Sequence, residues 1–173
     1  MADDGPASLQ INLLAKKVGA TKGSFYWHFK DILEFKQAML ELWEAKAASD
    51  VIEEVQSAPS AEERLHLLVV QAAQVAPEEY GGRKIEPAMR AWALSDPKVS
   101  SALAQIDDTR MTFIKQVLEG LGLESPALAQ LFYGAYIGLN DLNAKDKADM
   151  ESGLLELKNL ILAKAPFRGV LPG

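Results

Sequence analysis

The sequence contains no cysteine and only two histidines, His28 and His66. Without cysteine the chain forms no disulfide and no thiolate metal site, and it suits the cytoplasm, where thiols stay reduced. The two histidines lack the spacing of a zinc motif, and no glycine-rich phosphate loop follows a strand pattern. Carboxylates are left as candidate catalytic groups, but they are scattered as on solvated helices. We therefore expect no enzyme activity, metal or cofactor.

Long hydrophobic runs are also absent. No stretch approaches the roughly 18 consecutive apolar residues of a membrane span, and residues 1–4 do not read as a signal peptide. The 173 residues, 49% of them hydrophobic, fit one large domain or a small domain joined to a medium one. No strand pattern, repeat or low-complexity linker is visible. The sequence predicts an all-α, cytoplasmic protein without a membrane partner.

Basic residues are fewer than acidic ones, and the net charge is −6. The charge is distributed unevenly along the chain, because residues 9–30 contain four lysines and no acid. A basic head on an acidic body favours docking on nucleic acid phosphates at one end only. Lysines are also common on solvated helix faces, so charge alone leaves DNA binding and an ordinary surface as equal alternatives.

The basic segment begins with the pattern of a short helix. Ile11, Leu14, Ala15 and Val18 follow the i, i+3, i+4, i+7 spacing of one apolar face. Gly19 comes after the last apolar position, where a left-handed C-cap is expected. The segment therefore predicts a helix that ends in a glycine turn.

A second, aromatic-rich helix is predicted directly after this turn. Thr21 stands at its N-cap, and Phe25 and Phe29, four residues apart, share its inner face. Asp31 and Glu34 have the spacing of a capping box for a third helix. Two short helices joined by a tight turn form a helix-turn-helix motif, whose second helix lies in the major groove of DNA.

The string from Leu14 to Asp31, LAKKVGATKGSFYWHFKD, closely resembles the TetR family of bacterial repressors. Over the rest of the chain only the helical layout is similar, although the stretch around Trp92–Pro97 and Asp107–Arg110 also resembles the regulatory domain of some members. The resemblance implies an N-terminal helix-turn-helix head (residues 1–38) and a helical ligand-binding and dimerisation body (residues 39–173). It also implies a homodimer that binds a palindromic double-stranded operator and responds to an unknown small-molecule effector.

The chain departs from the family pattern at two places. The family has a full helix ahead of the segment that starts at Leu9, but residues 1–8 are polar and contain Gly5 and Pro6. The first helix is therefore expected to be missing or shortened, through truncation of the chain or through residues absent from this sequence. The position after Asp31 is commonly basic in the family, and here it is Ile32, which removes one phosphate contact.

Most candidate DNA contacts lie on the outer side or at the start of the second helix. Tyr26 and His28 resemble family positions that touch phosphates, which fix orientation and register. Lys22 can reach guanine O6/N7 or a phosphate, and Trp27 can pack on the backbone or a thymine methyl. Each has an ordinary surface role as the alternative. The predicted DNA-binding residues are Thr21, Lys22, Gly23, Ser24, Tyr26, Trp27, His28 and Lys30.

The body is predicted to consist of helices over residues 31–56, 60–76, 83–95 and 97–119, a helix from Pro126, and a helix over 147–164. Ser60 with Glu63, Asp96 and Ser125 supply capping signals. The loop at 77–82 and a tail from Pro166 are not helical. The residues expected to be buried along the 31–56 helix are Leu33, Phe35, Met39, Leu42, Trp43, Ala47, Val51, Ile52 and Val55.

Two surfaces of the body carry further expectations. A ligand pocket is expected among Trp43, Met89, Arg90, Trp92, Arg110, Met111 and Phe113, with an arginine as polar anchor. For each of these residues, ordinary core packing or a surface arginine is the alternative. The last two helices are expected to pair with those of a second copy through Leu128, Leu131, Phe132, Ala135, Tyr136, Leu139, Leu154, Leu157 and Ile161, and the alternative is a monomer core.

Taken together, these patterns predict a homodimeric DNA-binding transcriptional regulator that acts as a ligand-responsive repressor. The alternative is an α-helical dimeric ligand-binding protein with an incomplete, non-functional DNA-binding head. The missing first helix is the feature that separates the two.

Overall fold

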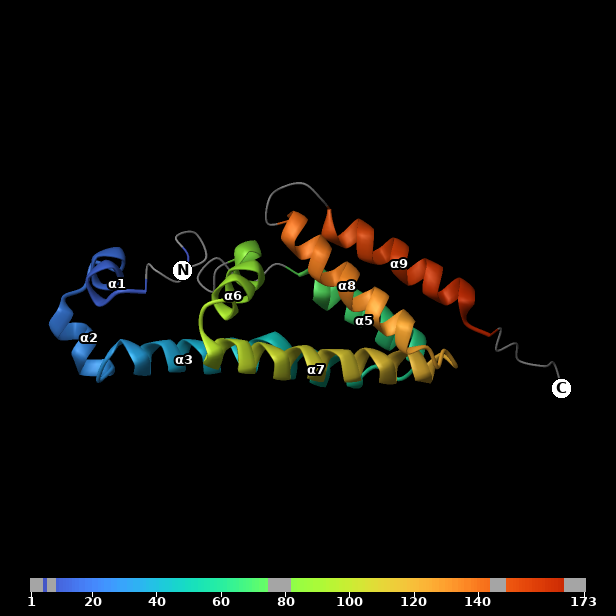
Figure 1. The fold of residues 1–173 in the computed structure, drawn as a ribbon. Coiled ribbons are helices and arrows are strands. Elements are labelled where there is room, and N and C mark those ends of the chain that lie inside the picture. The colour runs from blue at the N-terminus through green and yellow to red at the C-terminus, as the bar shows by residue number, and fades with distance from the viewer. Residues whose placement is uncertain (1–4, 6–8, 75–81, 144–148, 167–173) are drawn as a thin grey trace. The chain divides into compact units, whose positions relative to one another are not determined.

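The computed structural model describes residues 5, 9–74, 82–143 and 149–166. Over these residues the regular structure is helical and no strand occurs, which confirms the all-α expectation (Figure 1). No helix in this described part is long and apolar enough to cross a membrane. The chain divides into two compact units, residues 1–49 with 75–106 (unit 1) and residues 50–74 with 107–173 (unit 2).

Unit 1 contains the predicted helix-turn-helix. Its helices are α1 (Ile11–Lys17), α2 (Lys22–His28), α3 (Ile32–Glu44), a 3-10 turn (Gly82–Lys84), α6 (Ile85–Ala93) and the first part of α7 (Pro97–Gly120). Gly19 follows α1 with φ of 65°, so the predicted left-handed turn is confirmed. The prediction that residues 1–8 form no full helix concerns, apart from Gly5, residues that the structure does not describe.

Side-chain caps fix where α2 and α3 begin. The Thr21 hydroxyl accepts the Ser24 backbone N–H at 3.1 Å, as expected for an N-cap. One Asp31 carboxylate oxygen accepts the N–H groups of Leu33 and Glu34, each at 2.9 Å. The Glu34 carboxylate accepts the Lys30 backbone N–H, one residue before the position it takes in a standard capping box. Both predicted starts are confirmed.

The predicted 31–56 helix contains an irregular turn. After α3 the chain forms a π-helical turn (Ala45–Ser49) before α4 (Asp50–Gln56). A π turn holds one residue more than an α turn, so the buried residues Trp43 and Ala48 are five apart. No glycine or proline marks this site, and the α-helical spacing did not predict it.

Two residues of this helix were wrongly predicted to be buried. Leu33 is 68% exposed because it lies in the first turn of α3, where no described element covers it. Leu42 is 48% exposed because it is two positions from the buried Leu40, which places it on the opposite face of the helix.

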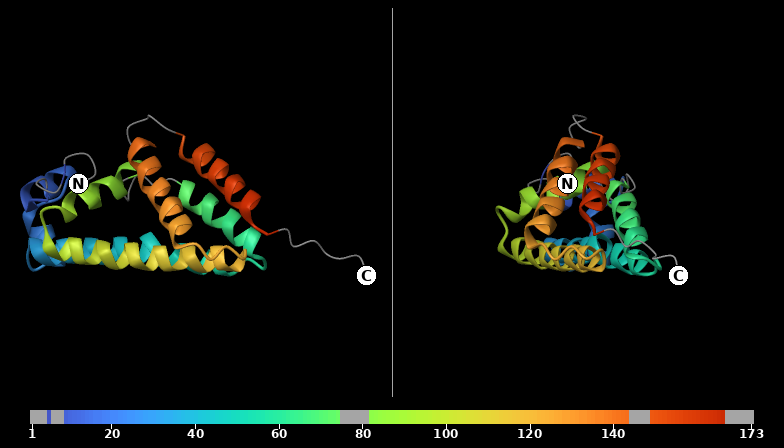
Figure 2. Two further views of the ribbon diagram at one scale, coloured as in Figure 1. Left: turned by 45° about the vertical axis from the view of Figure 1, so that its right-hand side comes forward. Right: turned by 90° about the vertical axis from the view of Figure 1, so that its right-hand side faces the viewer.

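Unit 2 is built from α4, α5 (Ala61–Ala73), the second part of α7, α8 (Pro126–Asn143) and α9 (Met150–Lys164). In both views of Figure 2, α8 and α9 lie side by side, and α9 also contacts α5. At one point α8 and α9 approach so closely that a Cβ on Gly153 would lie 2.9 Å from Leu139 Cδ1. The largest fully buried side chains of unit 2 are Val55, Leu65, Val69, Leu118, Phe132, Leu154 and Ile161.

The predicted ends of the body helices hold within a few residues. Ser60 caps α5 by accepting the Glu63 N–H at 3.1 Å, and Ser125 accepts the Leu128 N–H at 3.2 Å at the start of α8. Asp96 accepts the Lys98 N–H at 3.0 Å at the start of α7. Helix α5 ends at Ala73, earlier than predicted. The loop predicted at 77–82 lies outside the described residues except for Gly82. Residues 144–148 and the tail from 167 also lie outside them.

A polar cluster joins α7 to α8 in the core of unit 2. The Tyr133 hydroxyl donates to Asp107 Oδ1 at 2.6 Å and accepts from Arg110 Nη1 at 3.4 Å. The Arg110 guanidinium also lies 5.4 Å from the ring centre of Tyr136. Burial, together with the hydrogen bond to Asp107, raises the pKa of Tyr133 well above its ordinary value. Because the protonated phenol is the donor, this cluster is stable only while Tyr133 keeps its proton.

Tyr133→Phe is predicted to lower the free energy of unfolding by about 1.5–3 kcal/mol, the usual worth of a hydrogen bond to a charged group. The folded-state pKa is raised, so this contribution is fully present below about pH 10 and declines as the pH rises further. Urea denaturation at pH 8 and pH 11 should therefore give a smaller difference between the two proteins at the higher pH. Tyr26→Phe, at an exposed tyrosine, is the control and should leave stability unchanged. A difference independent of pH would contradict the assignment.

Gly19→Ala and Gly23→Ala are predicted to change the stability of the head in opposite directions. A Cβ at Gly19 meets no atom within 4 Å, so the cost comes from the positive φ alone and is about 1–2 kcal/mol. Gly23 is helical and its Cβ would lie 3.5 Å from Thr21 Oγ1, so alanine there should stabilise α2 by about 0.5–1 kcal/mol. Amide hydrogen exchange of α1 and α2 measures both effects. Equal destabilisation by both variants would contradict the assignment of a left-handed turn to Gly19 and of a helix to Gly23.

Candidate DNA-binding site

Helix α2 is held to α3 by three phenylalanine rings. The ring centres of Phe25 and Phe29 lie 5.5 Å apart, and Phe35 of α3 lies 5.8 Å from Phe25 and 5.1 Å from Phe29. All three side chains are half-buried. The prediction that Phe25 and Phe29 form the inner face of α2 is therefore confirmed, and Phe35 completes the cluster. This three-phenylalanine cluster leaves the opposite face of α2 outward.

The outward face carries the residues predicted from the sequence. Tyr26 is 56% exposed and Trp27 is 86% exposed, which is unusual for side chains of this size. The Tyr26 ring packs edge-on against Phe25 with 5.7 Å between centres, so the core sets its direction. The predicted DNA-binding residues that the structure places at the surface are Thr21, Lys22, Gly23, Ser24, Tyr26, Trp27, His28 and Lys30.

The hydroxyl groups of Thr21 and Ser24 stabilise the start of α2. Thr21 Oγ1 lies 3.1 Å from Ser24 Oγ, in addition to accepting the Ser24 backbone N–H. The pair therefore shares one hydrogen bond and fixes the first turn of the helix. Because Thr21 is engaged in this cap, it suits positioning of α2 better than direct reading of a base.

The charge around α2 is positive. Lys16 and Lys17 end α1, while Lys22 and Lys30 flank α2, and all four are exposed. The nearest acids along the chain, Asp31 and Glu34, are used as acceptors for backbone N–H groups at the start of α3. Their charge is thus placed on the α3 cap, and the reading helix itself carries only basic and neutral side chains, as phosphate contact requires.

The apolar face of α1 was partly mispredicted. Ala15 is buried and Ile11 and Leu14 are half-buried, but Val18 is 76% exposed. Val18 is the C-cap of α1, so the helical spacing no longer applies to it. Leu13, also on α1, is 49% exposed.

The residues predicted to line a ligand pocket belong to both units. Trp43, Met89 and Trp92 are core residues of unit 1, each less than a tenth exposed. Arg90 of the same unit pairs with the buried Glu86, with 2.8 Å between Nη2 and Oε1. Arg110, Met111 and Phe113 belong to unit 2, where Arg110 contacts Tyr133 and Tyr136. The pocket expected among these residues stays a prediction.

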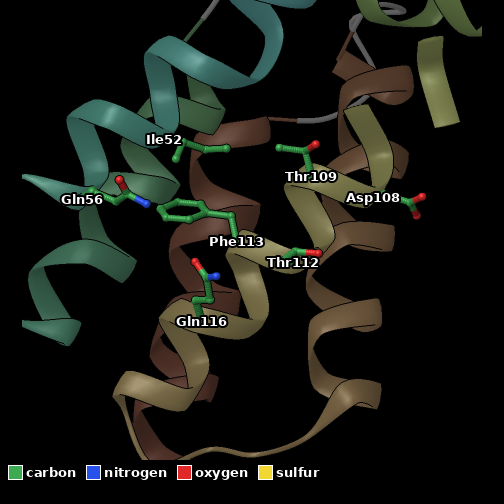
Figure 3. Close-up of a pocket in the computed structure, with 7 residues that line it drawn as sticks. All are labelled: Ile52, Gln56, Asp108, Thr109, Thr112, Phe113 and Gln116. Atoms are coloured by element: carbon green, nitrogen blue, oxygen red, sulfur yellow. The ribbon is translucent and has the colours of Figure 1, made fainter. Parts of the chain in front are cut away.

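An open groove of about 380 Å³ does occur in unit 2, between α4 and α7 (Figure 3). Of the predicted lining residues it contains only Phe113. Sequence reasoning missed the others, although they follow helical spacing, because spacing does not tell which helices lie side by side. The groove is lined by Ile52, Gln56, Asp108, Thr109, Thr112, Phe113 and Gln116.

The predicted dimer surface needs correction. Phe132, Leu154 and Ile161 are 1%, 0% and 1% exposed, so they pack inside unit 2 and cannot reach a second chain. Leu128, Ala135, Tyr136, Leu139 and Leu157 are half-buried. Of the predicted set, Leu131 alone is largely exposed, at 67%.

The chain was compared with known proteins. Residues 1–39 match the family model described as bacterial regulatory proteins, tetR family. The fold matches the crystal structure of a Rhodococcus sp. protein assigned to the TetR family of transcriptional regulators, with a TM-score of 0.69 and 21% sequence identity. That match covers 95% of this chain and 92% of the other. No curated protein matches the chain.

The helix-turn-helix geometry and the family match of residues 1–39 lead to the same assignment, and the fold agrees with it over nearly the whole chain. Residues 1–39 carry the helix-turn-helix of the tetR family of bacterial regulatory proteins, and the chain has the fold of a TetR-family transcriptional regulator.

Proposed function

We propose that the protein is a cytoplasmic, ligand-responsive repressor that binds a palindromic operator as a homodimer. The observation that carries this proposal is the outward face of α2, where Lys22, Tyr26, Trp27 and His28 are all exposed while the phenylalanine rings hold the helix from behind. In this proposal residues 1–38 read DNA and residues 39–173 dimerise and sense the ligand. No part of it requires enzyme activity.

The contacts of α2 divide into two kinds. Tyr26, His28 and Lys30 bind phosphates and fix the register of the helix on the duplex. Lys22 and Ser24 lie at the N-terminal end of α2, which a recognition helix brings closest to the base edges, and Lys22 suits guanine O6/N7. Trp27 packs on a thymine methyl or on the sugar-phosphate backbone. Thr21 positions the helix through its cap.

Dimerisation is proposed through the exposed face of α8. Leu131, Gly134, Gly138 and Leu142 follow helical spacing, and the two leucines are 67% and 41% exposed. A Cβ on either glycine would meet no atom within 4 Å in the single chain. Helices can approach closely where such small residues face each other, and the flanking leucines then bury apolar surface. Two copies related by two-fold symmetry would present two reading helices to successive major grooves.

The ligand response is proposed as a two-state equilibrium. The effector stabilises a conformation of the body in which the two heads do not fit the operator. It shifts the equilibrium only if it binds that state better than the DNA-bound state.

A second candidate function is an α-helical dimeric ligand-binding protein whose head does not grip DNA. It is favoured by the exposure of Leu13 and Val18 on α1, because no residue that the structure describes covers these two apolar side chains of the head. Fluorescence anisotropy with the DNA that flanks the gene, in a salt series, separates the two candidates. Selective binding that weakens steeply with salt supports the repressor, and a dimer without such binding supports the alternative.

Lys22→Ala and Tyr26→Phe are predicted to weaken DNA binding without changing helicity or dimerisation. Loss of Lys22 should reduce affinity by about tenfold or more if it contacts a base, and should lower the salt slope by about one if it contacts a phosphate. Lys115→Ala, an exposed lysine of α7 in unit 2, is the matched control. If both head variants bind like the control, α2 is not the reading helix.

Gly138→Leu is predicted to disrupt the dimer. In the single chain the new side chain meets open space and leucine is the better helix former, so the helicity should not fall. Between two closely packed helices the same side chain causes overpacking, and we expect the dimer dissociation constant to rise by at least about tenfold. Sedimentation equilibrium measures this change, with Gly23→Leu in the head as control. An unchanged dimer would move the interface away from α8.

A further inference from the structure

The groove between α4 and α7 combines an apolar floor with neutral polar walls. Phe113 is 6% exposed, so little of its ring is accessible, and it lies beside the half-buried Ile52. In Figure 3 the side chains of Ile52 and Thr109 point toward each other, and the Gln56 amide points toward the Phe113 ring. The two helices thus face each other through these two pairs of side chains.

The polar groups of the groove are exposed amides and hydroxyls. Gln56 and Gln116 lie on opposite helices, and within the described ranges neither side-chain amide has a protein hydrogen-bond partner. Each amide offers two N–H donors and one carbonyl acceptor, so together they can bind both kinds of ligand group. The Thr112 hydroxyl also belongs to the lining.

The charged side chain in the lining of the groove is acidic. Asp108 is the charged residue of the lining, it is exposed, and in Figure 3 it points away from Ile52 and Gln56. Among the residues that the structure describes, no lysine or arginine lines the groove. A carboxylate or phosphate ligand would therefore find no cation and one repelling charge, whereas a neutral ligand would lose nothing.

We propose that this groove binds the effector, and that the effector is a small neutral molecule with an apolar part and an amide-like hydrogen-bonding group. The inference rests on the ligand response proposed above. The apolar part packs on Ile52 and Phe113, and the polar part exchanges hydrogen bonds with Gln56 and Gln116. The volume of about 380 Å³ lies within the usual range for small-molecule sites.

Benzamide, benzamidinium and benzoate test this assignment, because the three probes share a shape and differ in charge. They are titrated into the full chain with methyl-labelled isoleucine, and the Ile52 methyl and the Gln56 and Gln116 side-chain amides are followed by NMR. We expect saturable shifts with benzamide and binding of benzoate that is at least about tenfold weaker. The buried Ile161 methyl should not respond. No saturable shift at Ile52, or equal binding of benzoate, would overturn the proposal.

Gln116→Lys sharpens the test, because the exposed position accepts the change without touching the core. The added cation should strengthen benzoate binding and weaken benzamidinium binding, and an unchanged order would show that the probes bind elsewhere. Gln74→Lys, at an exposed residue outside the groove, is the matched control.

The link to regulation is measured separately, as the effect of saturating benzamide on operator affinity. We expect a change of at least about fivefold, and no change would overturn the assignment of the groove as the effector site. If the chain binds DNA but Ile52 does not shift, the groove proposal fails alone. If Ile52 shifts but no DNA binds, the repressor proposal fails and the groove stands as a ligand site.

Discussion

The reading head depends on the packing of Phe25, Phe29 and Phe35. Helix α2 has seven residues, too few to be stable alone in water. Its conformation therefore comes from the rings behind it and from the N-cap at Thr21. The same contacts orient the outward face, because a ring pair that fixes one side of a short helix fixes the other side also. In the proposed function, DNA recognition therefore depends on an apolar contact that does not itself touch DNA.

In unit 2 as well, packing on one side of a helix determines which side stays exposed. Phe132, Leu154 and Ile161 pack in its core, whereas the face of α8 that carries Leu131 stays exposed. That exposed face is the one proposed to contact a second copy. The polar cluster of Tyr133, Asp107 and Arg110 lies between α7 and α8, and the Tyr133 hydroxyl is hydrogen-bonded to both of the other members. Buried polar groups that are fully paired fix one arrangement of the helices, because other arrangements leave them unpaired. The groove at Phe113 is lined by other residues of α7 than those in the cluster.

Several features of the site were predictable because their causes are local. The left-handed turn follows from Gly19, the starts of α2 and α3 from Thr21 and Asp31, and the inner face of α2 from the four-residue spacing of Phe25 and Phe29. The predictions that failed concern whether an apolar helix face is covered by another element. Leu33, Leu42 and Val18 are apolar and fit a helical pattern, yet they are exposed. Spacing reports which residues share a face, and it does not report whether another element covers that face.

The sequence by itself thus determined the all-α class, the helix-turn-helix, its caps and the residues that α2 presents. These depend on interactions within a few residues, where the identity of the side chain decides the backbone. Only the tertiary structure decided the π turn at Ala45–Ser49, the burial of Phe132, Leu154 and Ile161, and the groove that joins Ile52 and Gln56 to Phe113. Each of these depends on which helices meet and how closely. That outcome is fixed by packing between residues far apart in the chain, and no local pattern records it.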